Sequence, residues 1–301
     1  MLAIIIPYYK LSFFEETLVS LANQTDKRFK VYIGDDASPE NPLETLKEFQ
    51  GKFEYVYHRF EENLGSRSLV KQWERCIDLS KDEKWLMILG DDDFIGDTVV
   101  ELWYKNFDLF YKKTNVVRFA SKMIVQETNK ITDTFFHPVW EMSTESYYRK
   151  FRHLTRSSLS EYIFSRESFI KFGFHDYPLA WNSDDRAWLD FSDNKPIYTI
   201  NEGLVYFRLS ALNISGKQDN VNVKSLSVIS FYSFLILNKL KFYTPKQQEK
   251  IIRFYENEIS KQRKLKLSEW LFLSYFYMKY LDFYSIKKFI KRFFKSIFKK
   301  K

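Results

Sequence analysis

The sequence predicts an α/β fold in which a mostly parallel sheet is flanked by helices and followed by an all-helical C-terminal region. Short apolar runs alternate with helical patterns through residues 1–115, as they do when crossover helices join parallel strands. The run Ile4-Ile5-Ile6 is apolar at every position, which is typical of a strand covered on both faces. From about Lys217 onward the apolar residues follow a helical period and no strand pattern appears.

The individual elements follow in order along the chain. Apolar and β-branched runs predict strands at 2–7, 30–35, 53–58, 85–90, 116–125 and 196–210. Helical patterns at 13–23, 41–50, 66–79 and 97–112 separate the first five of these strands. We place a domain boundary at Ser215-Gly216. Residues 1–215 then form the sheet domain, with halves 1–115 and 116–215, and residues 216–301 form the helical region.

The composition limits the class of protein. The chain has 301 residues, of which 45% are hydrophobic and 19% aromatic, and this excludes a disordered protein. Cys76 is the single cysteine, so no disulfide can form within the chain and a reducing cytoplasm is expected. The N-terminal apolar run stops at Pro7, too early for a signal peptide. The apolar stretches at 227–237 and 270–278 are shorter than the roughly 20 residues that span a bilayer. Without export, Asn213 in its sequon is expected to carry no glycan.

A basic amphipathic helix is predicted at 285–299. Eight basic and no acidic residues lie between Ser285 and Lys301, and they account for the whole net charge of +8. The remaining chain is neutral, which argues against a nucleic-acid-binding protein. We expect this helix to bind an anionic membrane surface, with docking on the protein's own core as the alternative. Its apolar face would consist of Ile286, Phe289, Ile290, Phe293, Phe294, Ile297 and Phe298.

Polar or acidic residues lie at the ends of three of the predicted strands. The first strand ends in Pro7-Tyr8-Tyr9, the second in Gly34-Asp35-Asp36, and the fourth in Gly90-Asp91-Asp92-Asp93. Each alone has a structural explanation, since proline ends strands and aspartates cap turns and helices. Together they indicate a site at the carboxyl edge of the sheet, where open α/β folds bind ligands. Carboxylates without nearby His or Cys ligands favour Mg²⁺ or Mn²⁺.

Four segments in this order and spacing resemble family 2 glycosyltransferases with the GT-A fold: IIIPYYK, VYIGDDAS, NLGSRSLVKQWERCI and WLMILGDDDFIGD. The resemblance covers about residues 1–215 and implies a Rossmann-like, mixed but mostly parallel sheet. It also implies that Pro7 and Tyr8 shape a nucleotide pocket and that Asp36 accepts a hydrogen bond from the base, commonly uracil. Asn63 and Gly65 would form a turn before a helix that faces the nucleotide.

The aspartate triplet receives its roles from the same resemblance. Asp91 would lie beside the ribose, and Asp92 would bind a metal ion, Mn²⁺ or Mg²⁺, that bridges the diphosphate. Asp93 would support this metal site. Members of the family often have aspartate where this chain has Gly90, so the first carboxylate of the usual motif is missing here.

The family usually supplies its catalytic base from an acidic pair that opens a helix, and here WNSDDRAWLDF offers Asp184-Asp185. The spacing to Trp188 favours Asp185 as the base, and an adjacent carboxylate could raise its pKa. The alternative is a helix N-cap formed by Asn182, Ser183 or Asp184. The aromatic-rich region 137–182 is expected to carry the acceptor site.

These inferences predict a metal-dependent inverting glycosyltransferase. It would move a sugar from a nucleotide donor, expected to be a UDP-sugar, to a glycan or lipid-linked acceptor in bacterial surface polysaccharide synthesis, at the inner face of the cytoplasmic membrane. Arg208 could contact the diphosphate or form a surface ion pair. One alternative is a phosphohydrolase of the haloacid dehalogenase type that uses Asp91-x-Asp93, although Ile95 does not fit that motif. Another is a non-catalytic, membrane-docked adaptor on a glycosyltransferase-like fold.

Overall fold

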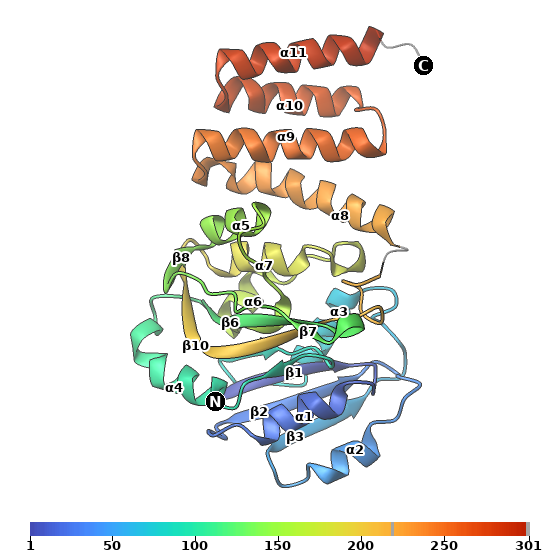
Figure 1. Cartoon of the computed structure of the whole chain (residues 1–301), viewed down its shortest axis with the longest axis vertical. Coiled ribbons are helices and arrows are strands. Elements are labelled where there is room, and N and C mark those ends of the chain that lie inside the picture. Colours follow the sequence, from blue (N-terminus) through green and yellow to red (C-terminus); the bar gives the residue numbers. More distant parts are fainter. Residues whose placement is uncertain (218–219, 299–301) are drawn as a thin grey trace. The chain divides into compact units, whose positions relative to one another are not determined.

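The computed structural model describes residues 1–217 and 220–298, with the backbone alone described at 297 and 298. The chain divides into two compact units, Met1–Asn220 and Val221–Lys301 (Figure 1). The first unit contains the sheet and the second is helical.

The first unit is built on one sheet with the strand order β3-β2-β1-β4-β9-β6-β10-β5, to which β7 adds through β6 and β8 through β10. The strands are β1 (Leu2–Tyr8), β2 (Phe29–Asp35), β3 (Glu54–Arg59), β4 (Trp85–Ile88), β5 (Phe94–Ile95), β6 (Val116–Val125), β7 (Lys130–Ile131), β8 (Trp140–Met142), β9 (Tyr162–Ser165) and β10 (Pro196–Leu209). Neighbours among β1–β4 run parallel, as does β10 beside β6, whereas β9 is antiparallel to both β4 and β6. The predicted α/β fold with a mixed, mostly parallel sheet is confirmed.

The register of the parallel strands brings three of their carboxyl ends together. Pro7 of β1 is paired with Gly34 of β2, and Ile5 of β1 is paired with Ile88 of β4. The polar residues that follow each strand therefore leave the sheet at the same edge. This edge is where ligands bind in open α/β sheets.

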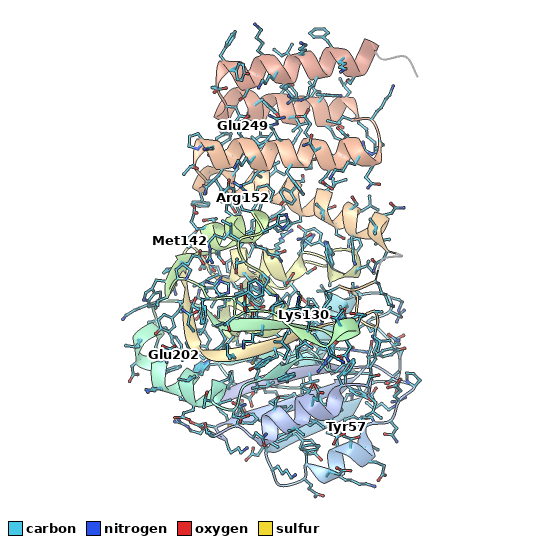
Figure 2. All side chains as sticks on the ribbon, in the orientation of Figure 1. Tyr57, Lys130, Met142, Arg152, Glu202 and Glu249 are labelled. Carbon is cyan, nitrogen blue, oxygen red and sulfur yellow. The ribbon has the colours of Figure 1, made fainter. Side chains whose placement is uncertain are left out.

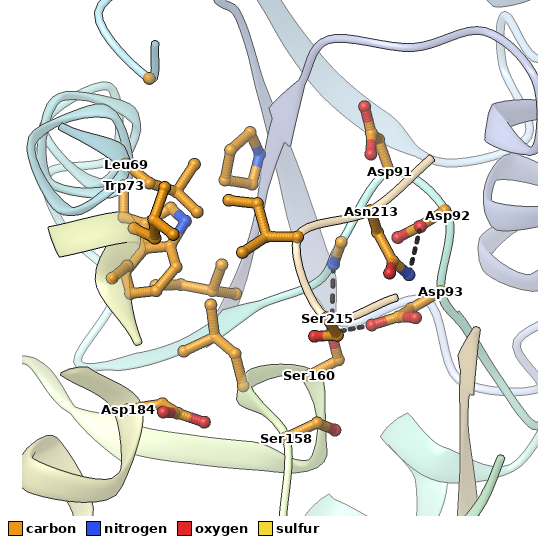
Figure 3. Close-up of a pocket in the computed structure, with 18 of the residues that line it drawn as sticks. Leu69, Trp73, Asp91, Asp92, Asp93, Ser158, Ser160, Asp184, Asn213 and Ser215 are labelled. Atoms are coloured by element: carbon orange, nitrogen blue, oxygen red, sulfur yellow. Dashed lines mark hydrogen bonds between the residues drawn. The ribbon is translucent and has the colours of Figure 1, made fainter. Parts of the chain in front are cut away.

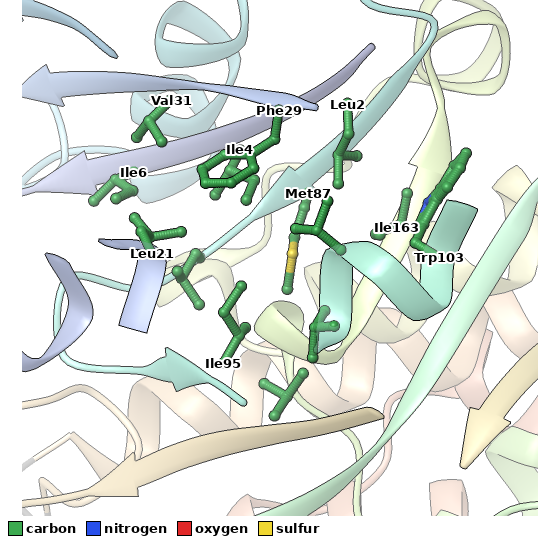
Figure 4. Packing of buried hydrophobic residues seen from close by; sticks show 14 of the residues in the cluster. Leu2, Ile4, Ile6, Leu21, Phe29, Val31, Met87, Ile95, Trp103 and Ile163 are labelled. Atoms are coloured by element: carbon green, nitrogen blue, oxygen red, sulfur yellow. The ribbon is translucent and has the colours of Figure 1, made fainter. Parts of the chain in front are cut away.

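Helices cover both faces of the sheet. They are α1 (Phe14–Ala22), α2 (Leu43–Glu48), α3 (Leu69–Ile77), α4 (Val99–Phe110), α5 (Ser143–Phe151), α6 (Arg166–Phe172) and α7 (Ser183–Phe191), with 3₁₀ turns η1 (Gln126–Thr128), η2 (Leu159–Glu161) and η3 (Pro178–Ala180). Successive residues of β1 enter different cores, because Ile4 and Ile6 pack in one hydrophobic cluster and Ala3 and Ile5 in the other. Figure 4 shows the first of these clusters. The continuous apolar run of β1 thus reflects a strand buried on both faces.

Helix α3 lies unusually close to β2. The Cys76 side chain is fully buried, and a Cβ atom at Gly34 would overlap its Sγ atom. The Gln72 side chain donates a hydrogen bond to the carbonyl oxygen of Gly34 (3.1 Å). Glycine at position 34 therefore allows the helix to approach the strand that carries Asp35 and Asp36. Burial raises the pKa of the Cys76 thiol.

The second unit begins with α8 (Val221–Phe234), which continues through the π-helical turn η4 (Leu235–Lys239) and the 3₁₀ turn η5 (Leu240–Phe242). It is followed by α9 (Pro245–Gln262), α10 (Leu267–Tyr280) and α11 (Phe283–Phe298). The continuous stretch Val221–Phe242 is long and apolar enough to cross a membrane, with a mean hydropathy of 1.3, although such a helix also occurs in soluble cores. The shorter run read from the sequence, 227–237, lies inside this stretch.

The terminal helix is α11, and residue 299 of the predicted span lies outside the described residues. Part of its apolar face packs on α10, because the ring of Phe289 stacks on Tyr277 with 4.3 Å between centroids. Ser285 donates a hydrogen bond to Glu249 of α9 (3.2 Å), which Figure 2 labels. Ile290 and Phe294 are 46% and 51% exposed. The helix is therefore partly docked and partly open to an external partner.

Candidate active site

A cavity of about 700 Å³ lies at the carboxyl edge of the sheet, entirely within the first unit. Its walls come from the segments that follow β1, β2 and β4, from the start of α3 and α7, and from the loop after β10. Figure 3 shows the aspartates of the β4 end and Asp184 of α7 as parts of the same lining. The predicted site residues that line it are Pro7, Asp36, Asn63, Gly65, Asp91, Asp92, Asp93, Asp184 and Asp185.

Two predicted site residues do not line this cavity. Tyr8 is fully buried in the core, and its hydroxyl donates to the carbonyl oxygen of Glu40 (2.8 Å). Its neighbours Pro7 and Tyr9 reach the cavity instead, because alternate residues of a strand point to opposite faces. Arg208 is the second predicted site residue that does not line the cavity.

Asp36 anchors the turn after β3 to the end of β2. Its carboxylate accepts hydrogen bonds from the backbone N–H groups of Leu64 (2.7 Å) and Gly65 (2.9 Å) and pairs with Arg75 of α3. Burial raises the pKa of Asp36, while these donors act to lower it. A Cβ atom at Gly65 would lie 2.5 Å from Asp36 Oδ2. The close approach of this turn to the carboxylate therefore requires glycine.

The aspartate triplet after β4 has three different environments. Asp91 Oδ2 accepts the backbone N–H groups of Tyr9 (2.7 Å) and Lys10 (2.8 Å). Asp93 accepts the backbone N–H of Arg208 (2.8 Å) and the hydroxyl of Ser160. Among the residues that the structure describes, the one side chain that donates to Asp92 Oδ2 is the amide of Asn213, at 3.4 Å. The outer two carboxylates thus hold neighbouring segments in place, and Asp92 keeps most of its hydrogen-bonding capacity.

The three carboxylates destabilise one another's charged forms. Burial and the charge of Asp92 raise the pKa of Asp91 to about 7 and the pKa of Asp93 to about 8. Burial also raises the pKa of Asp92 itself. Such a cluster favours the binding of a cation, which would offset the mutual repulsion.

The donor set fits Mg²⁺ or Mn²⁺, since it offers carboxylate oxygens and no His or Cys. Among residues 1–217 and 220–298, no group of three or more His, Cys, Asp or Glu side chains is arranged to hold a metal ion. A cation on Asp92 would therefore complete its coordination with ligands from outside the chain. Phosphate oxygens and water are the usual ones for Mg²⁺.

The space beside Gly90 is already occupied. A Cβ atom there would lie 3.1 Å from both Asp92 Oδ1 and Asp93 Oδ2. The carboxylates of Asp92 and Asp93 therefore occupy the space that a side chain at position 90 would need. An aspartate at position 90 would fit only if these side chains moved.

The acidic pair at the start of α7 is asymmetric. Asp185 is buried, and its carboxylate accepts hydrogen bonds from Lys150 Nζ (2.6 Å) and Asn182 Nδ2 (2.8 Å). Among the described residues, no side chain forms a hydrogen bond or ion pair with the Asp184 carboxylate, although the backbone N–H groups of Asp184 and Asp185 lie close enough to lower its pKa. Burial and the charge of Asp185 raise the pKa of Asp184 to about 6, although Lys150 acts to lower it.

The segment that leads into this pair has a strained backbone. Leu179, Ala180 and Asn182 have φ angles of 60°, 52° and 67°, a region that costs non-glycine residues on the order of 1 kcal/mol each. In this left-handed conformation Asn182 precedes α7, and its side chain reaches Asp185. Strain of this kind clusters at functional sites. All three residues line the cavity.

The family follows from a sequence comparison. The model of the family described as glycosyl transferase family 2 matches residues 3–170, more than half of the chain. This chain belongs to glycosyl transferase family 2. It is therefore a glycosyltransferase. No curated protein matches it in sequence.

Solved structures of another glycosyltransferase share its fold. S. aureus TarS 1–349 in complex with UDP-GlcNAc superposes with a TM-score of 0.62 at 16% identity, covering 91% of this chain and 80% of that one. The same fragment in complex with UDP gives a TM-score of 0.58 at 17% identity, covering 89% and 76%. A further structure of S. aureus TarS gives a TM-score of 0.60 at 17% identity, covering 89% of this chain and 46% of that one. These similarities establish the GT-A fold.

Arg208 of this glycosyltransferase lies outside the cavity lining and is 4% exposed. Its guanidinium pairs with Glu16, donates to Gln126 and to the carbonyl oxygen of Asp92 (3.1 Å), and lies 4.1 Å from the ring centroid of Phe13. The structure therefore places Arg208 in contact with Asp92 and Asp93 but outside the lining of the cavity. Its hydrogen bond to the carbonyl oxygen of Asp92 stabilises the turn that carries the three aspartates.

Several cavity residues of this family 2 enzyme were not predicted from the sequence as site residues. They are Tyr9, Lys10, Lys150, Arg156, Trp181 and Asn213. Lys10 directly follows the first strand, so its position at the strand end was a usable signal. Lys150 gives no such signal, because only the packing of α5 against α7 brings it to Asp185.

Proposed function

We propose that this glycosyltransferase uses a UDP-sugar and a divalent cation and transfers the sugar with inversion to a hydroxyl of a glycan or lipid-linked acceptor in bacterial surface polysaccharide synthesis. The observation that carries the proposal is that one cavity contains both the carboxylate of Asp92, which accepts a single long hydrogen bond from a described side chain, and the acidic pair Asp184–Asp185. A leaving diphosphate needs a cation, and an attacking hydroxyl needs a base.

Support for the donor comes from the end of the cavity near β2. A carboxylate offers about four lone pairs, and three donors occupy Asp36, one of them on Oδ2. Oδ2 thus retains capacity to accept one more hydrogen bond, such as that of the uracil N–H. The structures of S. aureus TarS with UDP-GlcNAc and UDP support this choice of nucleotide. Pro7, Asn63, Gly65 and Asp91 would complete the nucleotide-binding wall.

At the aspartate turn, Asp92 would hold Mn²⁺ or Mg²⁺, with Asp93 as its supporting neighbour. When bound, the metal ion supplies positive charge that stabilises the departing diphosphate. Lys10, which lines the cavity, adds a second positive charge on the same side. The acidic pair of α7 accepts the proton of the acceptor hydroxyl as its oxygen attacks the anomeric carbon.

A donor screen tests this function. We expect the purified chain with Mn²⁺ to release UDP from at least one sugar in a panel of UDP-sugars, and EDTA to abolish the release. Asp92→Ala should lower turnover by at least about 10²-fold, a range typical of lost transition-state charge stabilisation. The exposed Asp108 on α4 provides the matched control, since Asp108→Ala should leave turnover unchanged. Equal turnover by the wild type and Asp92→Ala would overturn the metal assignment.

The two alternatives are distinguished by the same screen. In a phosphohydrolase Asp91 would be the nucleophile, but one of its oxygens accepts two backbone N–H groups. Family membership also favours glycosyl transfer. A non-catalytic adaptor would give no UDP release with any donor.

We also propose that the helical unit holds the enzyme on the inner face of the cytoplasmic membrane. Exposed apolar side chains recur at helical spacing on α10, at Leu267, Leu271, Tyr275 and Met278, and α11 also exposes Ile290 and Phe294. Lys287, Lys288, Lys291 and Lys295 are exposed on α11. Exposed apolar side chains beside cations suit an anionic lipid surface. Each lysine there contributes on the order of 1 kcal/mol.

Vesicle flotation tests the membrane proposal without removing the docked helix. Changing these four lysines to glutamine should reduce binding to phosphatidylglycerol-containing vesicles at least about tenfold. Changing the exposed Lys246, Lys261 and Lys264 of the α9 region should have little effect. Equal binding by both variants, or equal binding to neutral phosphatidylcholine vesicles, would count against an electrostatic membrane site.

A further inference from the structure

Arg156 is a cationic side chain of the cavity lining that the proposed function does not use. Its Nη1 atom donates a hydrogen bond to the hydroxyl of Ser121 on β6 (3.0 Å) and pairs with the carboxylate of Glu161. Its guanidinium carbon lies 4.4 Å from the ring centroid of Phe207 on β10. An ion pair, a hydrogen bond and an aromatic ring therefore hold the guanidinium in one orientation.

The carboxylate that holds Arg156 is itself buried. The Glu161 side chain is fully buried, whereas the side chain of Arg156 is 14% exposed. Glu161 Oε1 accepts hydrogen bonds from Arg156 and from Ser158 (2.8 Å), and its Oε2 has no hydrogen-bond partner among the described residues. A buried carboxylate needs a compensating cation. The pair thus fixes a permanent positive charge at the cavity wall, because arginine stays protonated at every physiological pH.

One edge of the Arg156 guanidinium has no protein partner. Among residues 1–217 and 220–298, no group accepts a hydrogen bond from Nε or Nη2, and neither nitrogen is fully buried. The N–H groups on this edge point the same way, and their spacing matches two oxygens of a phosphate or a carboxylate. Since Arg156 lines the cavity, this edge is the part of the side chain that a ligand can reach.

The segment that carries Arg156 lies on the acceptor side of the cavity. In Figure 3, Ser158 and Ser160 appear between Asp184 and Asp93, and Ser160 donates a hydrogen bond to Asp93. The nucleotide is assigned to the opposite end of the cavity, near β2, and the diphosphate to the cation at the aspartate turn. A negatively charged group next to Arg156 would therefore belong to the acceptor.

We propose, on the basis of the function proposed above, that the Nε–Nη2 edge of Arg156 binds an anionic group of the acceptor, a phosphate or a carboxylate, and thereby selects acidic acceptors over neutral ones. Glu161 is the positioning residue for this contact. The aspartates that line the same cavity repel an anion, so an acidic acceptor needs a fixed cation of this kind to bind.

Three sugars that share one ring test the proposal: glucose 6-phosphate, glucuronate and glucose. Calorimetry is performed on protein saturated with UDP and Mg²⁺, so that the donor site is filled. The wild type should bind at least one of the two acidic sugars at least about tenfold more tightly than glucose. The one that binds more tightly distinguishes a phosphate site from a carboxylate site. Equal affinities for all three sugars, or no binding of either acidic sugar, would overturn the proposal.

Arg156→Gln should abolish this preference and leave the affinity for UDP unchanged. The exposed Arg152 at the end of α5 provides the matched control, because Arg152→Gln removes the same charge and should keep the preference. Since Arg156→Gln leaves Glu161 as an unpaired buried charge, the double variant Arg156→Gln/Glu161→Gln is measured beside it and should show the same loss. A preference that survives in the double variant would overturn the role of Arg156.

The affinity for UDP distinguishes an acceptor site from a donor site. A loss of UDP affinity in Arg156→Gln as large as its loss of affinity for the acidic sugar would place the guanidinium on the diphosphate and overturn the proposal. A wild type that releases UDP from no donor would instead contradict the proposed function, whereas the affinities for the three sugars test Arg156 alone.

Discussion

At the scale of single residues, the cavity depends on two glycines, Gly65 and Gly90, which have no Cβ atom. Gly65 lets a backbone turn approach Asp36, and Gly90 leaves room for the carboxylates of Asp92 and Asp93. In both cases the added Cβ atom would meet a carboxylate oxygen. These glycines therefore allow the charged side chains of the site to be crowded together.

Gly65→Ala should weaken UDP binding while the chain remains folded. The new methyl group would lie 2.5 Å from Asp36 Oδ2, so either the turn or the carboxylate must move. Titration calorimetry should show at least about a tenfold loss of UDP affinity, equivalent to about 1.4 kcal/mol. Near-UV circular dichroism should stay like that of the wild type. Unchanged UDP affinity would mean that this turn does not contact the nucleotide.

Asp92→Asn should stabilise the metal-free protein and remove its response to metal. The substitution takes away the charge that raises the pKa values of Asp91 and Asp93. A gain on the order of 1 kcal/mol is expected, which corresponds to roughly 2–4 °C in Tm. Mn²⁺ should raise the Tm of the wild type in the presence of UDP and leave that of the variant unchanged. A lower Tm in Asp92→Asn with EDTA would show that repulsion at this turn is already compensated.

At the scale of elements, the sequence predicted the strands whose ends form the cavity, and also β6 and β10, but it did not predict β9, which lies between β4 and β6. β1, β2 and β4 are apolar along their length and end in polar clusters. β9 has only four residues and enters antiparallel between β4 and β6. No pattern distinguishes so short a strand from a buried turn. The contact of Lys150 with Asp185 depends on the packing of α5 against α7. Neither this contact nor the position of Arg208 outside the cavity lining could be predicted from the spacing of residues in the sequence.

The loop after β10 provides an element-scale prediction. Asn213 donates to the carbonyl oxygen of Arg208 (2.6 Å) and accepts the backbone N–H of Gly216 (2.9 Å), while Lys10 donates to the carbonyl oxygen of Leu212. A Cβ atom at Gly216 would overlap the carbonyl oxygen of Ser210. Gly216→Ala should therefore open the loop and raise the KM for the UDP-sugar several-fold. Steady-state kinetics would show a fall in kcat alone if the loop instead controls the chemical step.

At the scale of the whole molecule, nucleotide binding and membrane binding are assigned to different units. Every residue that lines the cavity lies between Pro7 and Lys217, within the first unit, whereas the exposed basic helix belongs to the second. The two units meet at Asn220 and Val221, and the domain boundary at Ser215-Gly216 stays a prediction. The division into units also explains how the net charge can concentrate at one end of an otherwise neutral chain.

A chain that ends at Asn220 should therefore bind UDP with an affinity within about threefold of the full chain, a difference below 1 kcal/mol, and should no longer float with anionic vesicles. Calorimetry and vesicle flotation on the same preparation measure the two properties. A folded fragment that fails to bind UDP would show that the second unit contributes to the donor site. Retained flotation would place the lipid-binding surface on the first unit.

The close contact between Cys76 and Gly34 also makes this chain convenient for labelling chemistry. Its only cysteine is fully buried behind β2, and burial raises the pKa of the thiol, so a maleimide should not react with the native protein. Reaction at Cys76 would then report openings of α3 from the sheet, because only such openings expose the sulfur. A second cysteine at an exposed site, such as Lys288, could carry a fluorophore or spin label without any need to remove the first.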